Sequence, residues 1–374
     1  MTPTLRLGRV FGIQISMNWS LLFVFALIAW SVASAVPSDV PNRPVAEYWL
    51  AGILAAAGFY VCLLAHELAH SLLARRLGTP VSGITLWLFG GVSNLEGEPR
   101  SAAAEGAITA VGPMTSLALA LILSAAGAIL GAGRQSLTAD VLAWLGYINL
   151  ALGLFNLLPA FPLDGGRLLS AILWWRGGNR RQAVHRAARV GRWVAFAMIG
   201  VGFLMLWFGQ LLNGVWTAFL GWFLLSAASA EERGLDAQEL LKGIPVSAAM
   251  SSPVITLPDW LTVGQLLESA ALGHRFTTYP VHDRDNSLTG VVRLPEVLHS
   301  HGSDRDKRLH EVAHPIAEVP TARPEEDLSE VVRRAGPRIQ LRVLVYDGDR
   351  LAGILSPTDV VRVLTVRGAG AAAR

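Results

Sequence analysis

The chain has 374 residues, of which 52% are hydrophobic and only 16% are charged. A composition this apolar excludes an ordinary soluble enzyme and indicates a membrane protein. The formal net charge is only +3, and the sequence shows no solvated basic face with interleaved aromatic residues, so we expect no nucleic-acid partner. The single cysteine, Cys62, excludes an intrachain disulfide and a cysteine-based zinc ribbon, and we expect it to serve in packing.

The apolar residues are concentrated in the first part of the chain. We predict a membrane domain over 1–232, a linker over 233–243 and a soluble module over 244–374. Six segments are near or above the roughly 17–25 residues that cross a bilayer as a helix. These predicted spans are 17–36, 48–74, 102–131, 138–159, 191–211 and 214–230.

The first predicted span has a second interpretation. Arg6 and Arg9 precede it, and the alanine-serine-alanine sequence at 33–35 resembles a signal-peptide cleavage site. Its length favours a retained span, because a run of about 20 apolar residues is too long for a signal-peptide core.

Arginine residues orient the spans. With the N-terminus in the cytoplasm, most arginines of the membrane domain lie on the cytoplasmic side, and only Arg43 and Arg134 face out. An even number of spans then returns the soluble module to the cytoplasm. We therefore expect a multi-pass protein of the cell membrane whose N-terminus and C-terminal module are cytoplasmic.

The second predicted span carries polar residues in an apolar run, VCLLAHELAHSLLARR at 61–76. His66 and His70 are four residues apart, so on a helix their rings point the same way, with Glu67 beside them. Two neutral imidazoles can bind one Zn²⁺ while the glutamate accepts a proton. The alternative is a histidine pair that bonds to neighbouring polar groups. An ionisable residue within a span costs about 2.5–3.5 kcal/mol unless it is paired or hydrated, which favours the metal site.

A third ligand is needed for a catalytic zinc ion. The candidate is Asp164 in NLLPAFPLDGGR at 156–167, where the fourth span ends at Pro159 and Pro162. The same aspartate could instead cap a short interfacial helix, and spacing alone leaves these two roles equally open.

The two motifs together resemble the site-2 protease family of intramembrane zinc metalloproteases, peptidase family M50. The resemblance implies that His66, His70 and Asp164 are the zinc ligands, one zinc ion per chain, and that Glu67 is the general base. It also implies that Asn156 positions the substrate or polarises its carbonyl group. The substrate would be a single-span membrane protein, for example an anti-sigma factor or a signal-peptide remnant, cleaved in regulated intramembrane proteolysis.

The segment VSGITLWLFGGVSNLEGEP at 81–99 is too short for another helical span. It resembles the family's membrane-inserted β-hairpin, in which Gly90 and Gly91 would contact the substrate; an ordinary interfacial hairpin is the alternative. Gly112 and Pro113 match the family's third span, where small residues allow close helix packing. We expect Asn149 to form a helix-to-helix hydrogen bond.

Two similar segments follow the membrane domain, each an extended run, a helix and a hairpin, with Gly290 and Gly353 lying 63 residues apart. They resemble a tandem CBS pair, over 244–303 and 304–374, that binds an adenine nucleotide and commonly forms a homodimer. In GILSPTDVV the resemblance assigns nucleotide contacts to Ser356, Thr358 and Asp359. The first half departs from this pattern with Arg293 and Glu296, so we expect at most one standard site; a dimerisation module without ligand is equally open.

The sequence thus predicts a polytopic α-helical membrane protein, with six transmembrane helices and a short membrane-inserted β-hairpin, followed by a soluble α+β tandem CBS module. We expect an intramembrane zinc endopeptidase. A catalytically silent scaffold is disfavoured because His66, Glu67, His70 and Asp164 are all present. A CBS-gated ion or metal transporter is disfavoured because the two membrane halves show no inverted repeat.

Overall fold

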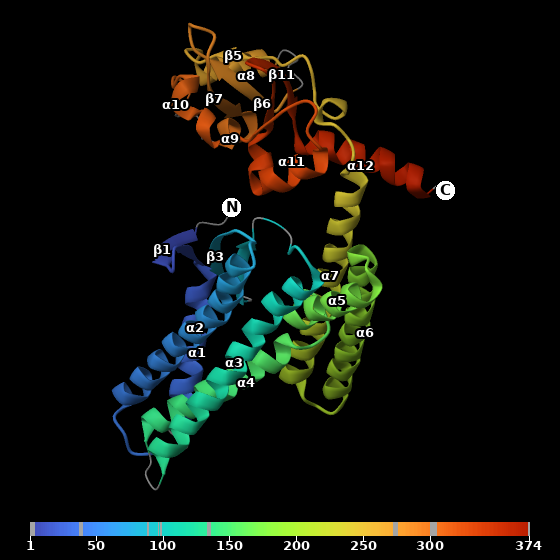
Figure 1. Ribbon diagram of the computed structural model, residues 1–374. Coiled ribbons are helices and arrows are strands. Elements are labelled where there is room, and N and C mark those ends of the chain that lie inside the picture. The colour runs from blue at the N-terminus through green and yellow to red at the C-terminus, as the bar shows by residue number, and fades with distance from the viewer. Residues whose placement is uncertain are drawn as a thin grey trace. The chain divides into compact units, whose positions relative to one another are not determined.

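The computed structural model describes residues 4–36, 40–87, 90–95, 97, 99–132, 136–271, 276–299 and 305–372 (Figure 1). The chain divides into two compact units, Met1–Arg233 and Gly234–Arg374. The segment predicted as a linker over 233–243 is helical as far as Leu241, because it continues the preceding helix. Its run of alanine, glutamate, glutamine and leucine residues favours helix over coil.

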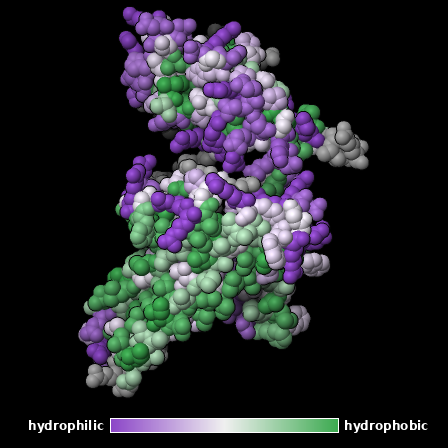
Figure 2. All heavy atoms as spheres, viewed as in Figure 1, coloured by the Kyte–Doolittle hydropathy of each residue, from purple (hydrophilic) through white to green (hydrophobic). Residues whose placement is uncertain are grey.

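Helices make up most of the first unit. Five of them are long and apolar enough to cross a membrane, namely α2, α3, α4, α6 and α7, whereas the apolar α1 has only 16 residues. Figure 2 shows hydrophobic residues across the visible face of this unit, as expected for helices that face lipid. The helices are α1 (Ser20–Ala35), α2 (Val45–Arg76), α3 (Ala102–Gly131), α4 (Leu137–Asn156), α5 (Asp164–Gly177), α6 (Arg180–Trp207) and α7 (Leu211–Leu241).

Local capping explains where several helices begin. The side chains of Ser101, Ser136 and Asn179 each accept a hydrogen bond from a backbone N–H of the first turn of α3, α4 and α6, respectively. Helix α5 ends at Gly177, and the next residue, Gly178, has a φ of 69°, a conformation that suits glycine. These signals are local in sequence, so the helix ends follow from the residues themselves.

A four-stranded sheet accompanies the helices, with β1 (Thr4–Val10), β2 (Ile13–Asn18), β3 (Val81–Trp87) and β4 (Gly90–Leu95). The order is β1-β2-β3-β4, with β2 and β3 parallel and the other pairs antiparallel. Strands β3 and β4 pair antiparallel within the segment predicted as a hairpin over 81–99. The first two strands were not predicted, and β2 occupies the start of the span predicted over 17–36. Among the described residues β4 pairs only with β3, so its outer edge is open.

The second unit repeats one pattern of a strand, a helix and a hairpin. The first copy contains β5 (Leu257–Pro258), α8 (Val263–Ala271), β6 (Thr278–His282) and β7 (Leu288–Arg293). The second contains β9 (Thr321–Ala322), α11 (Leu328–Ala335), β10 (Val343–Asp347) and β11 (Arg350–Leu355). Gly290 pairs with Val281 and Gly353 with Val345, so the two glycines occupy equivalent places. The remaining elements are η2 (Val246–Ala248), α9 (Leu294–His299), α10 (Leu309–Val312), β8 (His314–Pro315), η3 (Ile316–Glu318), η4 (Gly336–Leu341) and α12 (Pro357–Ala372).

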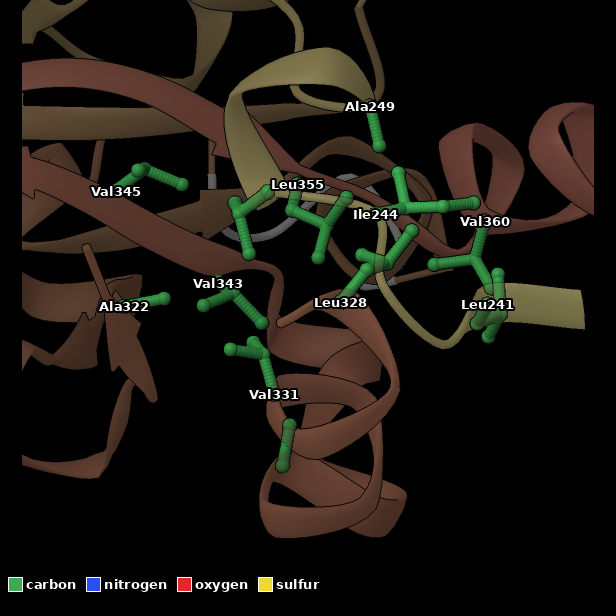
Figure 3. Packing of buried hydrophobic residues seen from close by; sticks show 12 residues of the cluster. Leu241, Ile244, Ala249, Ala322, Leu328, Val331, Val343, Val345, Leu355 and Val360 are labelled. Atoms are coloured by element: carbon green, nitrogen blue, oxygen red, sulfur yellow. The ribbon is translucent and has the colours of Figure 1, made fainter. Parts of the chain in front are cut away.

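The core of the second copy is drawn in Figure 3. Leu328 and Val331 of α11 pack against Val343 and Leu355 of the hairpin. Leu241, the last residue of α7, is buried in the same cluster. The final turn of α7, which belongs to the second unit, is therefore part of that unit's hydrophobic core.

Candidate metal centre

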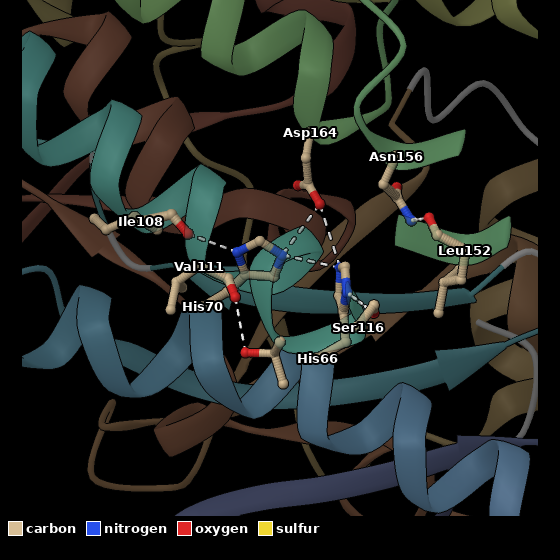
Figure 4. Close-up of polar contacts among 9 residues, drawn as sticks. His66, His70, Ile108, Val111, Ser116, Leu152, Asn156 and Asp164 are labelled. Atoms are coloured by element: carbon tan, nitrogen blue, oxygen red, sulfur yellow. Dashed lines mark hydrogen bonds and ion pairs between the residues drawn. The ribbon is translucent and has the colours of Figure 1, made fainter. Parts of the chain in front are cut away.

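Helix α2 positions the two histidines of the second predicted span. Their rings lie one turn apart, and the two Nε2 atoms are 3.1 Å from each other (Figure 4). His66 and Glu67 are buried, with 3% and 8% of their surfaces exposed. The α-helical period thus brings both rings to one side of α2, and Glu67 lies between them in the sequence.

Asp164 joins the histidines from the start of α5. Its Oδ2 atom lies 3.2 Å from His66 Nε2 and 3.3 Å from His70 Nε2. The N-cap position of α5 is Leu163, and the Asp164 side chain points to the imidazoles rather than to the helix terminus (Figure 4). Gly165 and Gly166 permit this placement, because a Cβ at either position would overlap the backbone of the preceding loop.

The far side of each imidazole ring contacts α3. His70 Nδ1 lies 2.6 Å from the backbone carbonyl oxygen of Ile108. Since a carbonyl only accepts, Nδ1 must carry the proton, which leaves Nε2 of a neutral His70 with a free lone pair. His66 Nδ1 lies 2.9 Å from Ser116 Oγ. Neither Ile108 nor Ser116 was predicted as a site residue. The sequence pattern that could have indicated them is their position four residues before and four residues after Gly112, on one face of the helix.

The residues present fit a zinc ion. Three acceptor atoms lie 3.1–3.3 Å apart, and the buried Asp164 Oδ2 makes no hydrogen bond within the described part of the chain. A single proton can serve only one of these contacts at a time, whereas one metal ion satisfies all three. Tetrahedral ligands at zinc distances of about 2.0–2.2 Å lie about 3.3–3.6 Å apart, close to the separations here. A zinc ion held by these three residues would keep a fourth position for water or substrate, as in catalytic zinc sites.

Glycine residues let the backbone approach this cluster. A Cβ at Gly91 of β4 would overlap the Glu67 side chain, and a Cβ at Gly112 of α3 would overlap His70 Nε2. Gly90, the other glycine predicted to contact substrate, has a φ of 131°, and a Cβ added there would meet no heavy atom within 4 Å among the described residues. Of the two hairpin glycines, Gly91 is therefore the one that touches the site.

The two asparagines of α4 each donate a hydrogen bond to a backbone carbonyl oxygen of their own helix. Asn156 Nδ2 donates to the carbonyl oxygen of Leu152 at 3.0 Å, which turns its amide toward its own helix (Figure 4). Asn149 is buried, and its Nδ2 donates to the carbonyl oxygen of Leu145, one turn earlier in α4. This hydrogen bond lies within one helix, so the helix-to-helix hydrogen bond expected of Asn149 stays a prediction.

The second unit contains a cavity of about 250 Å³ between its two halves. Ser356, Thr358 and Asp359 all line it, as does the buried Thr278, whose hydroxyl has no hydrogen-bond partner among the described residues. The Asp359 carboxylate accepts hydrogen bonds from Ser251 Oγ and from the backbone and hydroxyl of Ser356, so it braces the cavity wall. The full lining is Ser251, Pro253, Val254, Ile255, Phe276, Thr277, Thr278, Arg342, Ile354, Ser356, Thr358 and Asp359.

The first half differs at the residues that depart from the nucleotide pattern. Arg293 forms an ion pair with Glu296, whose other carboxylate oxygen lies 2.7 Å from His314 Nε2. The three side chains therefore bond to one another where a hydroxyl and an aspartate were expected. Arg342, on the cavity side, donates to Thr277 Oγ1, and burial lowers the pKa of its guanidinium group.

Comparison with known proteins places these observations in a family. The sequence model of peptidase family M50 matches residues 54–134 and 130–200, and that of the CBS domain matches 310–366. Rip3 of Mycobacterium tuberculosis, whose name describes a candidate zinc metalloprotease, is 42% identical over 371 residues, covering 98% of this chain and 94% of Rip3. Zinc metalloprotease MJ0392 of Methanocaldococcus jannaschii is 28% identical over 369 residues, covering 98% and 97%.

A solved structure is also similar. The site-2 protease from Methanocaldococcus jannaschii is 26% identical and matches 62% of this chain and 95% of its own, with a TM-score of 0.41. The M50 match includes the histidines of α2 and Asp164, and the similarity to Rip3 extends over nearly the whole length. The chain is a multi-pass membrane protein that belongs to peptidase family M50 and carries a CBS domain at its C-terminal end.

Proposed function

We propose that this protein is an intramembrane zinc endopeptidase that hydrolyses a peptide bond in the transmembrane segment of a membrane-tethered protein. The supporting observation is the convergence of His66, His70 and Asp164 on one point beside Glu67, on a helix long and apolar enough to span a membrane. When bound there, zinc supplies a Lewis acid that polarises a carbonyl group and acidifies water.

The protein's own groups divide the remaining work. The buried Glu67 carboxylate accepts the proton of the attacking water and delivers it to the leaving amine. The open edge of β4 pairs with the substrate backbone, which keeps the scissile segment extended instead of helical. Asn156 is proposed to turn away from Leu152 and donate to the scissile carbonyl group when substrate is bound.

The same proposal includes the membrane arrangement. Helix α1 crosses the membrane in addition to the five longer helices, which makes six spans in all. The N-terminus and the CBS module are cytoplasmic. The β3–β4 hairpin lies at membrane depth, where strands are tolerated only if they line a protein-walled cavity. Its packing beside Glu67 at Gly91 supports this placement, since the Glu67 helix itself spans the membrane.

An adenine nucleotide is the proposed ligand of the cavity in the second unit. Ser356, Thr358 and the unpaired hydroxyl of Thr278 offer polar contacts, and Arg342 contributes positive charge near the phosphates. Binding there regulates the protease, and the CBS module is the proposed homodimer contact. In the first half, Arg293 and Glu296 stand where the nucleotide pattern has a hydroxyl and an aspartate, and they bond to each other and to His314. This difference supports one nucleotide per chain.

Two measurements on the protein in detergent test the proposal. They are its zinc content and its cleavage of a panel of single-span substrates, including an anti-sigma factor and a signal-peptide remnant. We expect one zinc per wild-type chain and cleavage; Glu67→Gln retains zinc without cleaving, and Asp164→Ala loses zinc. Addition of ATP tests regulation. Wild type without zinc would overturn the protease assignment and favour a membrane scaffold, and full cleavage by Glu67→Gln would remove Glu67 from the mechanism.

A further inference from the structure

We infer that Ser116 is a positioning residue that holds His66 in its metal-binding tautomer, and that α3 orients both histidine ligands. The inference rests on the zinc site of the proposed function. It concerns a residue outside the two sequence motifs, on a helix that contributes no ligand atom of its own.

Helix α3 presents three positions of one face to the site. Ile108, Gly112 and Ser116 follow at intervals of four residues, so they lie one above another on the helix. The carbonyl group of Ile108 contacts His70, Gly112 adjoins both Nε2 atoms, and Ser116 contacts His66. The two ligands on α2 are four residues apart, and their partners on α3 follow in the opposite chain order, eight residues apart.

Ser116 can accept the hydrogen bond that the metal-binding tautomer of His66 donates from Nδ1. A metal ion between the two histidines needs Nε2 of His66 without a proton, so the single proton of the neutral ring must stay on Nδ1. Ser116 Oγ, at 2.9 Å, is the atom placed to accept a hydrogen bond from that N–H. Without this acceptor, the proton is free to move to Nε2, where the Asp164 carboxylate lies 3.2 Å away and competes with the metal.

Burial raises the importance of this contact. Ser116 is completely buried, and His66 is 3% exposed, so water cannot replace the lost acceptor at no cost. Partners of metal-bound histidines typically contribute 10- to 100-fold to metal affinity, about the effect expected for the Ser116 hydroxyl.

The neighbouring hydroxyl provides a matched control. Thr115 Oγ1 donates to the carbonyl oxygen of Val111, one turn earlier in its own helix, at 2.8 Å. Thr115 therefore lies next to Ser116 in sequence and resembles it chemically, but this hydrogen bond stays within α3. Removing each hydroxyl in turn separates an effect on His66 from a general effect on the helix.

The experiment measures Zn²⁺ affinity of the purified full-length protein by competition with a chromophoric chelator, together with the unfolding temperature of the metal-free form. The variants are Ser116→Ala, the equally shaped pair Ser116→Thr and Ser116→Val, and Thr115→Val. We expect Ser116→Ala and Ser116→Val to bind Zn²⁺ about 10- to 100-fold more weakly than wild type. Ser116→Thr and Thr115→Val should stay within about twofold, with little change in the metal-free unfolding temperature.

Two results would overturn the inference while leaving the proposed function intact. One is wild-type zinc affinity in Ser116→Ala or, if that variant does not fold, equal affinities for the threonine and valine variants. The other is an equal loss of affinity in Thr115→Val. Failure of the proposed function gives a different result, because wild type itself would then bind no zinc.

Discussion

Gly91 and Glu67 are the residues through which the sheet meets the metal centre. A Cβ on Gly91 would overlap the Cγ and Cδ atoms of Glu67, so the absence of a side chain at position 91 determines where the carboxylate lies. The backbone at Gly91 is otherwise compatible with alanine, because its φ is not in the left-handed region. Substitution at this position therefore displaces Glu67 without straining the strand itself.

We expect Gly91→Ala to lower the cleavage rate about 10- to 100-fold while zinc stays bound, since small displacements of a catalytic group have effects of this size. Gly106→Ala is the control: its Cβ would lie 3.6 Å from Ala171 Cβ, an ordinary contact. Cleavage kinetics and zinc content measured on both variants check this. Unchanged cleavage by Gly91→Ala would show that Glu67 does not need its present position.

At the scale of secondary structure, Asp327 links the segment just after α7 to the first turn of α11. Asp327 is the N-cap of α11, accepts a hydrogen bond from the backbone N–H of Ser329, and also accepts one from Gly243 N just after α7. The hydrogen bond from the Ser329 hydroxyl, together with the backbone N–H groups, lowers the pKa of Asp327. The Asp327 carboxylate thus binds the backbone just after α7 and also caps the first turn of α11.

Asp327→Ala should destabilise α11 by about 1 kcal/mol, the usual value of an N-cap. Because the pKa of Asp327 is lowered by folding, its stabilising effect is present above the unfolded value of about 3.9 and is lost as the pH falls through the folded value. Hydrogen exchange of the α11 amides in the full chain measures both effects. Equal exchange in wild type and variant at neutral pH would contradict the prediction.

Leu241, the last residue of α7, offers a second test of how α7 joins the second unit. It is 3% exposed in the core of the second unit, so Leu241→Ala should destabilise that unit by about 2–5 kcal/mol through lost burial and a cavity. The exposed Glu239, on the same helix, supplies the control Glu239→Ala. Denaturant unfolding of the full chain, followed by exchange of second-unit amides, distinguishes the two; similar effects of both changes would contradict the assigned core role.

At the scale of the whole molecule, two ligands are proposed for two separate units. All three proposed zinc ligands belong to Met1–Arg233, and every residue that lines the cavity belongs to Gly234–Arg374. A ligand stabilises the unit that binds it by mass action, about 2.7 kcal/mol at a concentration 100 times its Kd. Metal and nucleotide should therefore protect different parts of the chain.

Removal of zinc with a chelator should speed hydrogen exchange in α2 and α3 and leave the strands of the second unit unchanged. Addition of ATP should slow exchange around Thr278 and Ser356, which line the cavity. Exchange mass spectrometry of the full chain in detergent checks both. Zinc-dependent protection confined to the second unit would place the metal elsewhere.

Much of this arrangement follows from the sequence alone. The apolar runs predict the membrane helices, because length and hydropathy are local properties. The spacing of His66, Glu67 and His70 places them on one helix with both rings on one side, because the α-helical period is constant. The two similar segments of the C-terminal region likewise predict a repeated strand, helix and hairpin, and both copies are present.

Tertiary structure decided what depends on contacts between distant residues. Asp164 could be a helix cap or a ligand, and only the approach of α5 to α2 brings its carboxylate to the histidines. Strand β2 pairs with β3, about 70 positions later in the sequence, and β1 joins the same sheet by pairing with β2. Ser116 reached His66 across 50 residues. Such pairings arise from packing of whole helices and strands, so no local pattern of residues specifies them.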